Sequence, residues 1–191
     1  MEVPLLIDKR KFDIRVWVLV TQEGRAYFFK EGYIRTSSEE YNLLANDITK
    51  DSIHLTNNAV QKNMENYGKY EEGNILAFAH LQTHLNQALG RSAHDYVATS
   101  LVPQIKSQIV LSLEAVRGKL ALDKGCFELF GYDFLVDADL RVWMIEVNTN
   151  PCLEEPSKIL TAYLHRMIND ALKLTVDLAF PPRRGMGPYK P

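Results

Sequence analysis

Three side chains whose oxygen atoms suit a hard metal ion lie between residues 127 and 150. Asp133 and Glu146 supply carboxylates, and Asn148 supplies a carboxamide. An all-oxygen set of this kind suits Mg²⁺ or Mn²⁺, whereas zinc prefers nitrogen and sulfur ligands. We therefore expect a magnesium site, with manganese as an alternative, wherever the fold brings these side chains together.

The elements that must position them are two strands joined by a turn. Two segments rich in β-branched and aromatic residues flank the polar turn 137–140, a pattern that predicts an antiparallel hairpin. A hairpin closed at that turn pairs Val136 with Arg141, and therefore Asp133 with Met144.

In this register Glu146 is the diagonal cross-strand neighbour of Asp133, with Cβ atoms roughly 7 Å apart, so that both carboxylates reach one cation. Asn148 points the same way because side chains alternate along a strand. Apolar residues on both faces predict a covered hairpin, in which bare carboxylates are costly unless they are paired or bound to metal. The pattern favours a cation site over a buried salt bridge. The apolar residues are Leu135, Val142 and Met144 on the carboxylate face, and Tyr132, Phe134, Val136, Trp143, Ile145 and Val147 on the other.

The composition is that of one soluble globular domain. The chain has 191 residues, of which 46% are hydrophobic and 24% charged, and its net charge is −2, so we expect no nucleic-acid partner and only local anion-binding surfaces. No apolar run approaches the roughly 20 residues that span a bilayer, which predicts no membrane insertion. Charged residues interrupt the first ten positions, and the two cysteines form no disulfide framework. We therefore expect a cytosolic protein with reduced thiols.

Hydrophobic periodicity predicts helices packed on an antiparallel sheet, an α+β fold. The polar stretch 36–74 is too long for an idle connector, so we expect a functional loop there. The tail 181–191 is predicted to be disordered. The other predicted strands are 11–20, 25–30 and 33–35, and the predicted helices are 75–89, 95–118, with a start nearer Val102 because of Pro103, and 156–180.

Two further groups of residues suit the binding of anions. Alternation places Lys11, Asp13 and Arg15 on one face of a strand, where a surface ion-pair ladder is the alternative interpretation. Arg35 precedes three hydroxyl residues, and the planar fork of an arginine matches phosphate oxygens. His54 is interpreted as a structural hydrogen-bonding residue. The sequence contains no Gly-rich phosphate loop, Ser/His/Asp arrangement or dinucleotide fingerprint, so any chemistry depends on charge and positioning around a metal.

Six segments, taken in order, resemble the tubulin–tyrosine ligase-like enzymes, which have an ATP-grasp fold. They are KFDIRVWVLV, GYIRTSSEEYN, HLTNNAVQKN, YGKYEEGN, FELFGYDFLVD and VWMIEVNTNPCLE. The resemblance runs from about Pro4 to Phe180, which predicts a family domain over residues 1–180. It implies an ATP-dependent ligase that adds tyrosine, glutamate or glycine to a tubulin carboxylate through an acylphosphate. Such a protein is expected in the cytoplasm with the cytoskeleton, cilia included, with tubulin or microtubules as partners.

The resemblance also implies roles for the charged residues. Asp133, Glu146 and Asn148 are expected to hold the Mg²⁺ ions that bridge the ATP phosphates. Arg35 is expected to meet the γ-phosphate and the developing acylphosphate, with Arg15 in the same cluster.

Further positions are expected to contact the nucleotide. Thr56 and Asn57 match residues that line its pocket. Lys11 and Asp13 match residues that contact it directly, with Asp13 toward the ribose.

The resemblance covers only the C-terminal ATP-grasp portion of the family, so the chain is expected to be either a fragment or a shortened copy. ATP-grasp proteins hold nucleotide between two subdomains, and we therefore expect weak ATP binding and little activity from this chain alone. Two alternatives stay open. One is a non-catalytic module that binds tubulin or microtubules, and the other is a carboxylate–amine ligase with a substrate other than tubulin.

Overall fold

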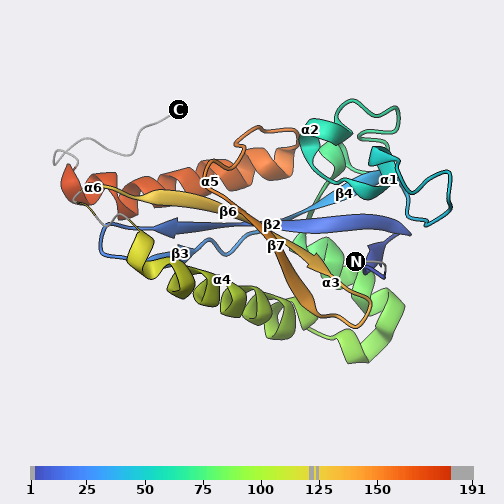
Figure 1. Ribbon diagram of the computed structural model, residues 1–191, viewed down its shortest axis with the longest axis horizontal. Coiled ribbons are helices and arrows are strands. Elements are labelled where there is room, and N and C mark those ends of the chain that lie inside the picture. Colours follow the sequence, from blue (N-terminus) through green and yellow to red (C-terminus); the bar gives the residue numbers. More distant parts are fainter. Residues whose placement is uncertain (1–2, 121–122, 124, 182–191) are drawn as a thin grey trace.

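Seven strands of the described residues form one antiparallel sheet, with β2 at its centre (Figure 1). The structure is a computed structural model that describes residues 3–120, 123 and 125–181. The order across the sheet is β5-β4-β2-β6-β7, and β1 and β3 also pair with β2. The strands are β1 (Leu6–Ile7), β2 (Arg10–Val20), β3 (Ala26–Phe28), β4 (Tyr33–Glu40), β5 (Ile75–Ala77), β6 (Glu128–Val136) and β7 (Val142–Asn148). The α-helices are α1 (Asp51–His54), α2 (Asn58–Gln61), α3 (Phe78–Leu89), α4 (Val102–Val116), α5 (Lys158–Leu174) and α6 (Val176–Ala179).

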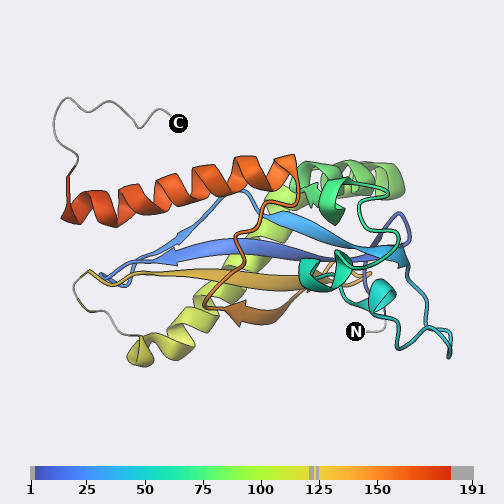
Figure 2. The same cartoon turned by 90° about the horizontal axis from the view of Figure 1, so that it is seen from above.

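Alternation along β2 gives the sheet two apolar faces. Phe12, Ile14 and Val16 are almost inaccessible and pack with residues of α3 and α4. Trp17 points to the opposite face, where Leu164 and Met167 of α5 cover it. Figure 2 shows the helices on the two sides of the sheet. This layering confirms the predicted α+β class, with an antiparallel sheet packed by helices.

The predicted hairpin is formed by β6 and β7, but its register differs by one residue from the expected one. Val136 pairs with Val142 rather than with Arg141, and the amide of Asp137 donates to the carbonyl of Arg141 at 3.0 Å, so that residues 138–140 form a three-residue loop. Leu140 takes a left-handed conformation with φ 64°, and its amide donates to the carbonyl of Asp137 at 2.9 Å. A three-residue loop that ends in the left-handed region is a common way to close a hairpin.

A β-bulge then changes the register beside the acidic residues. Phe134 pairs with Met144, and Asp133 pairs with Glu146, so Ile145 has no partner across the ladder. The prediction that Asp133 faces Met144 is therefore wrong. Because a bulge inserts one extra residue, the two carboxyl side chains become directly opposed instead of diagonal.

The prediction that the hairpin is covered on both sides is wrong for β7. Trp143 and Ile145 are 51% and 50% exposed, because β7 lies at the edge of the sheet and no helix of the described residues covers these side chains. Backbone groups on the outer edge of β7 nonetheless form hydrogen bonds with a side chain of α4. The side chain of Gln108 donates to the carbonyl of Val142 at 2.7 Å and accepts from the amide of Met144 at 2.8 Å.

Several predicted elements have different boundaries in the structure. The strand predicted at 33–35 extends to Glu40 as β4, so residues 36–40 are strand rather than loop. Residues 75–77 form a strand rather than the start of a helix, because they pair with β4. The segment 95–118 begins with a π-helical turn at Val97–Leu101, and the α-helix starts at Val102, as Pro103 indicated. The C-terminal helix is interrupted at Thr175, which takes a non-helical conformation.

The polar stretch after β4 folds onto that strand instead of forming an open loop. Gln61 accepts a hydrogen bond from the amide of Ser38 at 2.9 Å. Asn74 donates to the carbonyl of Thr36 at 3.2 Å, and Glu71 forms a two-pronged ion pair with the buried Arg10. These contacts fix the segment that carries α1 and α2 beside β2 and β4.

Several smaller expectations can also be compared with the structure. The first hairpin is confirmed, with β2 and β3 paired across residues 21–25. Cys126 and Cys152 are both exposed and unpaired. Among the helices that the structure describes, none combines the length and apolar character needed to cross a bilayer. The predicted disorder of the tail concerns residues 182–191, which lie outside the described residues.

Candidate functional site

Two arginines and two aspartates form a buried cluster on the face of the sheet that carries Trp17. Arg35 donates from Nε to Oδ1 of Asp13 at 2.7 Å and from Nη2 to Oδ2 of Asp133 at 2.8 Å. Arg15 donates from Nη2 to Oδ2 of Asp133 at 2.9 Å and also pairs through Nε with Oδ1. All four residues are at most 7% exposed, which overturns the alternative of a surface ion-pair ladder.

Strand pairing brings these side chains together from distant parts of the sequence. Asp13 is the cross-strand partner of Arg35 in β4, and Arg15 is the partner of Asp133 in β6. Gly131 makes room for Arg15, because a Cβ at that position would lie 2.8 Å from Cβ of Pro151 and 3.3 Å from Cδ of Arg15. The cluster is thus determined by the order of three neighbouring strands.

The electrostatics of the cluster favour the charged forms of Asp133 and Arg35. Burial disfavours the charge on Asp133, but the hydrogen bond from Arg15 and the charge of Arg35 outweigh it and lower the pKa of that carboxyl. Burial likewise opposes the charge on Arg35, yet Asp13 and Asp133 together raise the pKa of its guanidinium. Two positive and two negative charges leave the cluster neutral, so its arginines are held in place without a net buried charge.

A cavity of about 270 Å³ opens beside this cluster. Arg15 and Arg35 contribute to its wall, and so do Glu146, Asn148 and Asn57. Five of the nine residues predicted to form the site therefore surround one space. Asp13 and Asp133 do not line the cavity, but they pair with the two arginines that do.

Lys11 and Thr56 are not among the residues that line this cavity. Lys11 donates from Nζ to the carbonyl of His54 at 2.8 Å, and burial lowers the pKa of its ammonium group. Thr56 is 7% exposed and adjoins Asn57 in the chain. His54 Nε2 lies 3.1 Å from the carbonyl oxygen of Asp47, in agreement with its interpretation as a structural residue.

The three predicted metal ligands are neighbours but are not equivalent. Asn148 donates from Nδ2 to Oε1 of Glu146 at 3.1 Å, and both side chains face the cavity. Asp133 lies directly across the ladder from Glu146, but its oxygens already accept hydrogen bonds from Arg15 and Arg35. The alternative of a buried salt bridge thus describes Asp133, whereas Glu146 takes no part in that ion pair.

The donor set nevertheless fits a cation. An ionised carboxylate has about four lone-pair positions, and the two arginines use three of those on Asp133, which leaves one on Oδ1. Glu146 Oε2 and Asn148 Oδ1 accept no hydrogen bond from the described residues. No group of three His, Cys, Asp or Glu side chains in the described part of the chain suits a metal ion, so such a site depends on the amide oxygen of Asn148.

Sequence reasoning missed several residues of the cavity. Tyr33 is 4% exposed, and burial raises the pKa of its phenol. Lys62 and Asn150 reach the cavity from the segments after α2 and β7. Both lie inside segments that carry the family resemblance, HLTNNAVQKN and VWMIEVNTNPCLE, and that was the signal that could have found them. The other residues missed are Asn58, Ala59, Ile75, Pro151, Cys152, Glu154, Pro156 and Leu160.

The sheet, the arginine pair and the adjoining acidic and amide side chains define an α+β domain with a candidate site for anions and a cation. The chain belongs to the tubulin-tyrosine ligase family, whose model matches residues 1–184. It is 32% identical over 179 residues to tubulin glycylase 3B of Tetrahymena thermophila, covering 93% of this chain and 15% of that protein. It is 32% identical to tubulin glycylase 3D of the same organism, covering 97% of this chain and 18% of that protein.

A mammalian relative shows the same extent of similarity. The protein polyglycylase TTLL10 of Mus musculus is 31% identical over 178 residues, covering 91% of this chain and 25% of that protein. The chain therefore spans a quarter or less of the length of these curated relatives.

Proposed function

We propose that this domain is the metal- and phosphate-binding part of an ATP-dependent ligase that adds an amino acid to a carboxylate of tubulin. The observation that carries the proposal is the buried Arg15–Arg35–Asp133 cluster beside Glu146 and Asn148 in a member of this family. The names of the three relatives favour glycine over tyrosine or glutamate as the added amino acid.

Such a ligase reaction requires neutralisation of phosphate charge more than covalent catalysis by a protein side chain. Phosphoryl transfer is accelerated by positioning and by preorganised positive charge. Arg35 and Arg15 supply two fixed guanidinium groups at the cavity wall, and their partners Asp13 and Asp133 hold them in orientation. Burial keeps these donors away from water, which strengthens their interaction with phosphate or acylphosphate oxygens.

Glu146 and Asn148, with the remaining lone pair of Asp133, are the residues that would hold Mg²⁺ in this proposal. The ion, when bound, neutralises phosphate charge. Glu146 is the carboxylate that we assign to the metal ion, because it takes no part in the arginine ion pairs and faces the same cavity. Asn148 orients Glu146 through their hydrogen bond and leaves its own amide oxygen for the ion. Asn57 and Lys62 also line the cavity, and in this proposal they would contact the nucleotide.

We further propose that the sheet forms the C-terminal part of an ATP-grasp nucleotide site and that a longer protein completes it. The exposed face of β7 and the small share of the relatives' length that this chain spans support this view. The 191-residue chain alone should bind Mg-ATP weakly. Isothermal titration calorimetry of that chain is the measurement, and micromolar affinity would overturn the expectation.

The test of the ligase function is Glu146→Gln in the longer protein that carries this domain. The substitution removes a metal-binding charge while preserving shape, so ligation should fall roughly 100-fold, as when one preorganised electrostatic contact is lost. The readout is mass spectrometry of amino-acid transfer to tubulin, with circular dichroism to confirm folding. Glu128→Gln, at an exposed position of β6, is the matched control and should leave turnover unchanged. Unchanged turnover in Glu146→Gln would refute the assignment.

A second candidate function is a non-catalytic module that binds tubulin or microtubules. It is favoured by the complete pairing of both arginines with internal carboxylates. This candidate predicts co-sedimentation of the chain with microtubules without ATP or Mg²⁺, and no loss of that binding in Glu146→Gln. The ligase function predicts instead the roughly 100-fold loss of turnover given above for the same substitution.

A further inference from the structure

Tyr33 brings a phenol group to the two arginines of the candidate site. It lies at the start of β4, two residues before Arg35, and its cross-strand partner in β2 is Arg15. Because side chains alternate along a strand, Tyr33 and Arg35 lie on the same face of the sheet. Tyr33 lines the cavity of about 270 Å³ together with both arginines. Of these three cavity residues, Tyr33 is the one to which the function proposed above gives no role.

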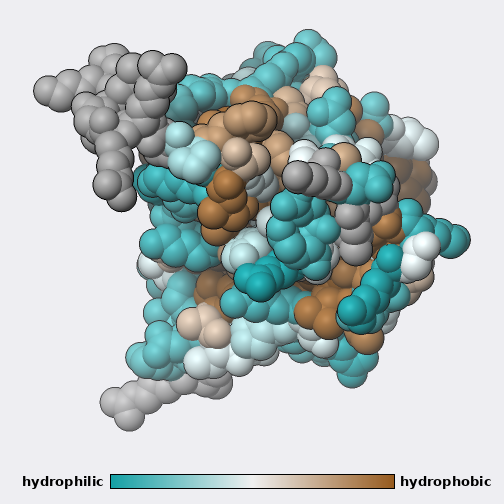
Figure 3. Space-filling model, turned by 90° about the vertical axis from the view of Figure 1, so that its left-hand side faces the viewer, coloured by the Kyte–Doolittle hydropathy of each residue, from teal (hydrophilic) through white to brown (hydrophobic). Residues whose placement is uncertain are grey.

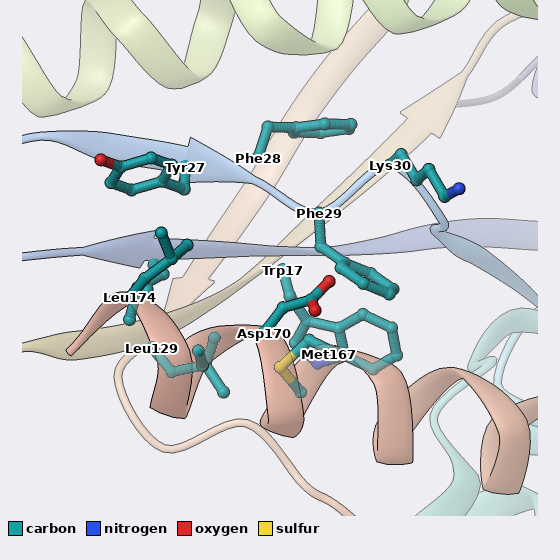
Figure 4. Close-up of a pocket in the computed structure, with 11 residues that line it drawn as sticks. Trp17, Tyr27, Phe28, Phe29, Lys30, Leu129, Met167, Asp170 and Leu174 are labelled. Atoms are coloured by element: carbon teal, nitrogen blue, oxygen red, sulfur yellow. The ribbon is translucent and has the colours of Figure 1, made fainter. Parts of the chain in front are cut away.

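The aromatic ring of Tyr33 is held in place by packing. Its centroid lies 5.1 Å from that of Trp17, and both rings belong to a buried cluster with Leu160 and Leu164 of α5. Figure 4 shows the next layer of this packing, with Met167 of α5 against the indole of Trp17. Tyr33 is 4% exposed. The apolar core therefore fixes the position of the phenol beside the arginines.

The hydroxyl group of Tyr33 forms no hydrogen bond with any described residue. In the described part of the chain, the side-chain atoms that are both fully enclosed and unpartnered are Nε of Arg10 and Nε1 of Trp17. The Tyr33 hydroxyl is not one of them, so it retains accessible surface, and the open space that Tyr33 borders is the cavity. A buried tyrosine hydroxyl usually has a partner. Tyr96 shows this usual arrangement, because its hydroxyl donates to the carbonyl of Leu140 at 2.8 Å.

The surroundings of the Tyr33 hydroxyl suit it to donate to an anion. Burial raises the pKa of the phenol and outweighs the charges of Arg15 and Arg35, which lower it, so the hydroxyl keeps its proton at neutral pH. The carboxylates of Asp13 and Asp133 already accept hydrogen bonds from the two arginines. An anionic oxygen bound by the arginines would therefore supply the acceptor that the protein does not.

We propose that Tyr33 is a third donor to the phosphoryl group that Arg15 and Arg35 bind, through a hydrogen bond from its hydroxyl to a phosphoryl oxygen. This inference rests on the ligase function proposed above. A phosphoryl group offers three terminal oxygens to these three donors, whereas a carboxylate offers two.

In the transfer step, an oxygen of the acceptor carboxylate forms a bond to the γ-phosphorus of ATP. The bond between that phosphorus and the bridging oxygen breaks, and its electron pair leaves with ADP. Tyr33 keeps its proton throughout and stabilises the charge on the phosphoryl oxygens.

The test is Tyr33→Phe in the longer protein that carries this domain. The substitution keeps the ring that packs on Trp17 and removes only the hydroxyl. The turnover number for ligation should fall roughly tenfold to 100-fold, as expected for the loss of a hydrogen bond to a charged group, while the KM values for tubulin and the amino acid stay unchanged. The unfolding midpoint of the 191-residue chain should not fall, because the hydroxyl has no partner among the described residues.

Tyr96→Phe is the matched control, because it removes a buried hydroxyl that donates to a backbone carbonyl. It should lower the unfolding midpoint and leave turnover unchanged at temperatures well below that midpoint. Full turnover in Tyr33→Phe, or a loss of stability like that of Tyr96→Phe, would overturn the proposal. If Glu146→Gln loses activity and Tyr33→Phe does not, only the role of Tyr33 is wrong. Full turnover in both variants would refute the ligase function itself.

Nuclear magnetic resonance of the 191-residue chain, labelled with ¹³C at Cζ of tyrosine, measures the contact directly. The Tyr33 signal is identified by its loss in Tyr33→Phe. Inorganic phosphate should move this signal in a saturable manner, whereas acetate at the same ionic strength should not. The absence of a saturable shift with phosphate would contradict the proposal. A shift with acetate alone would also contradict it, because the site would then take a carboxylate.

Discussion

At the scale of single residues, Asp133 is the side chain on which the candidate site depends most. It is 3% exposed and accepts hydrogen bonds from both Arg15 and Arg35. Removing one member of a buried ion pair is far more costly than the net contribution of the pair, because the remaining charge loses its partner. Asp133 thus combines a structural role with its expected role toward a cation.

Asp133→Asn should lower the free energy of unfolding by about 3–5 kcal/mol, because two buried guanidinium groups then share one fewer carboxylate. Urea denaturation followed by circular dichroism is the measurement. Asp139→Asn, at an exposed position of the β6–β7 turn, should change stability by less than about 0.5 kcal/mol. A difference below 1 kcal/mol between the two variants would argue against a buried pair.

The dependence of stability on pH follows from the same residue. Hydrogen bonding from Arg15 and the charge of Arg35 outweigh burial and hold the pKa of Asp133 below its value in the unfolded chain. The contribution of Asp133 is therefore complete above the unfolded pKa of about 3.9 and is lost as the pH falls through the lower folded pKa. The unfolding free energy of the wild type should decline below about pH 4 more steeply than that of Asp133→Asn. Parallel curves for the two proteins would contradict this assignment.

At the scale of elements, β7 carries Glu146 and Asn148 although it is the edge strand of the sheet. Its ladder to β6 contains the bulge at Ile145, and α4 completes its outer edge with side-chain hydrogen bonds. An edge strand has unpaired backbone groups that must be satisfied or protected. The position of Glu146 therefore depends on a helix that never contacts the cavity.

Gln108→Ala should loosen β7 because it removes two of the three hydrogen bonds between α4 and the strand and leaves the one from the amide of Val142 to Gln104. We expect a loss of about 1–3 kcal/mol in stability and faster hydrogen exchange at the amide of Met144. Ser107→Ala, at the exposed neighbouring position, is the control and should leave that amide protected. Equal exchange rates in the two variants would show that α4 does not hold the edge.

At the scale of the whole molecule, the polar segment after β4 contacts the segment before α5 beside the cavity. Gly73 has φ 65°, and a Cβ there would lie 2.5 Å from the carbonyl oxygen of Pro156. The amide of Lys158 donates to Glu72 at 3.2 Å. Both segments also supply cavity residues, so their contact couples the two walls of the site.

The end of the molecule that carries α6 exposes apolar side chains to solvent. Apolar side chains gather at one end of the molecule, where β2 ends and α6 lies (Figure 3). Leu178 and Phe180 are 73% and 78% exposed there.

Gly73→Ala should destabilise the chain by about 1–3 kcal/mol, because the new side chain meets backbone and the left-handed conformation is strained for alanine. Gly118→Ala is the matched control, since a Cβ at Gly118 meets no atom within 4 Å. Thermal unfolding measures both. An equal midpoint for the two variants would indicate that residues 73 and 156 do not touch.

The sequence alone determined the local chemistry of this protein. Alternation along residues 11–19 correctly separated the buried apolar side chains from Asp13 and Arg15, because strand geometry has a fixed period of two. The polar turn predicted the hairpin that makes Asp133 and Glu146 neighbours, although their directly opposed register was not predicted. The resemblance of six ordered segments identified the family, which the comparisons confirmed.

Only the tertiary structure decided how the charges are partnered. Arg15 and Asp133 are 118 residues apart in the sequence, and their pairing depends on β6 lying next to β2, which no local pattern specifies. The bulge at Ile145 was likewise invisible, because residues 142–145 are all apolar and show no alternation that an extra residue would interrupt. Long-range strand order and one local irregularity therefore determined which carboxylate is bound by the arginines and which one faces the cavity.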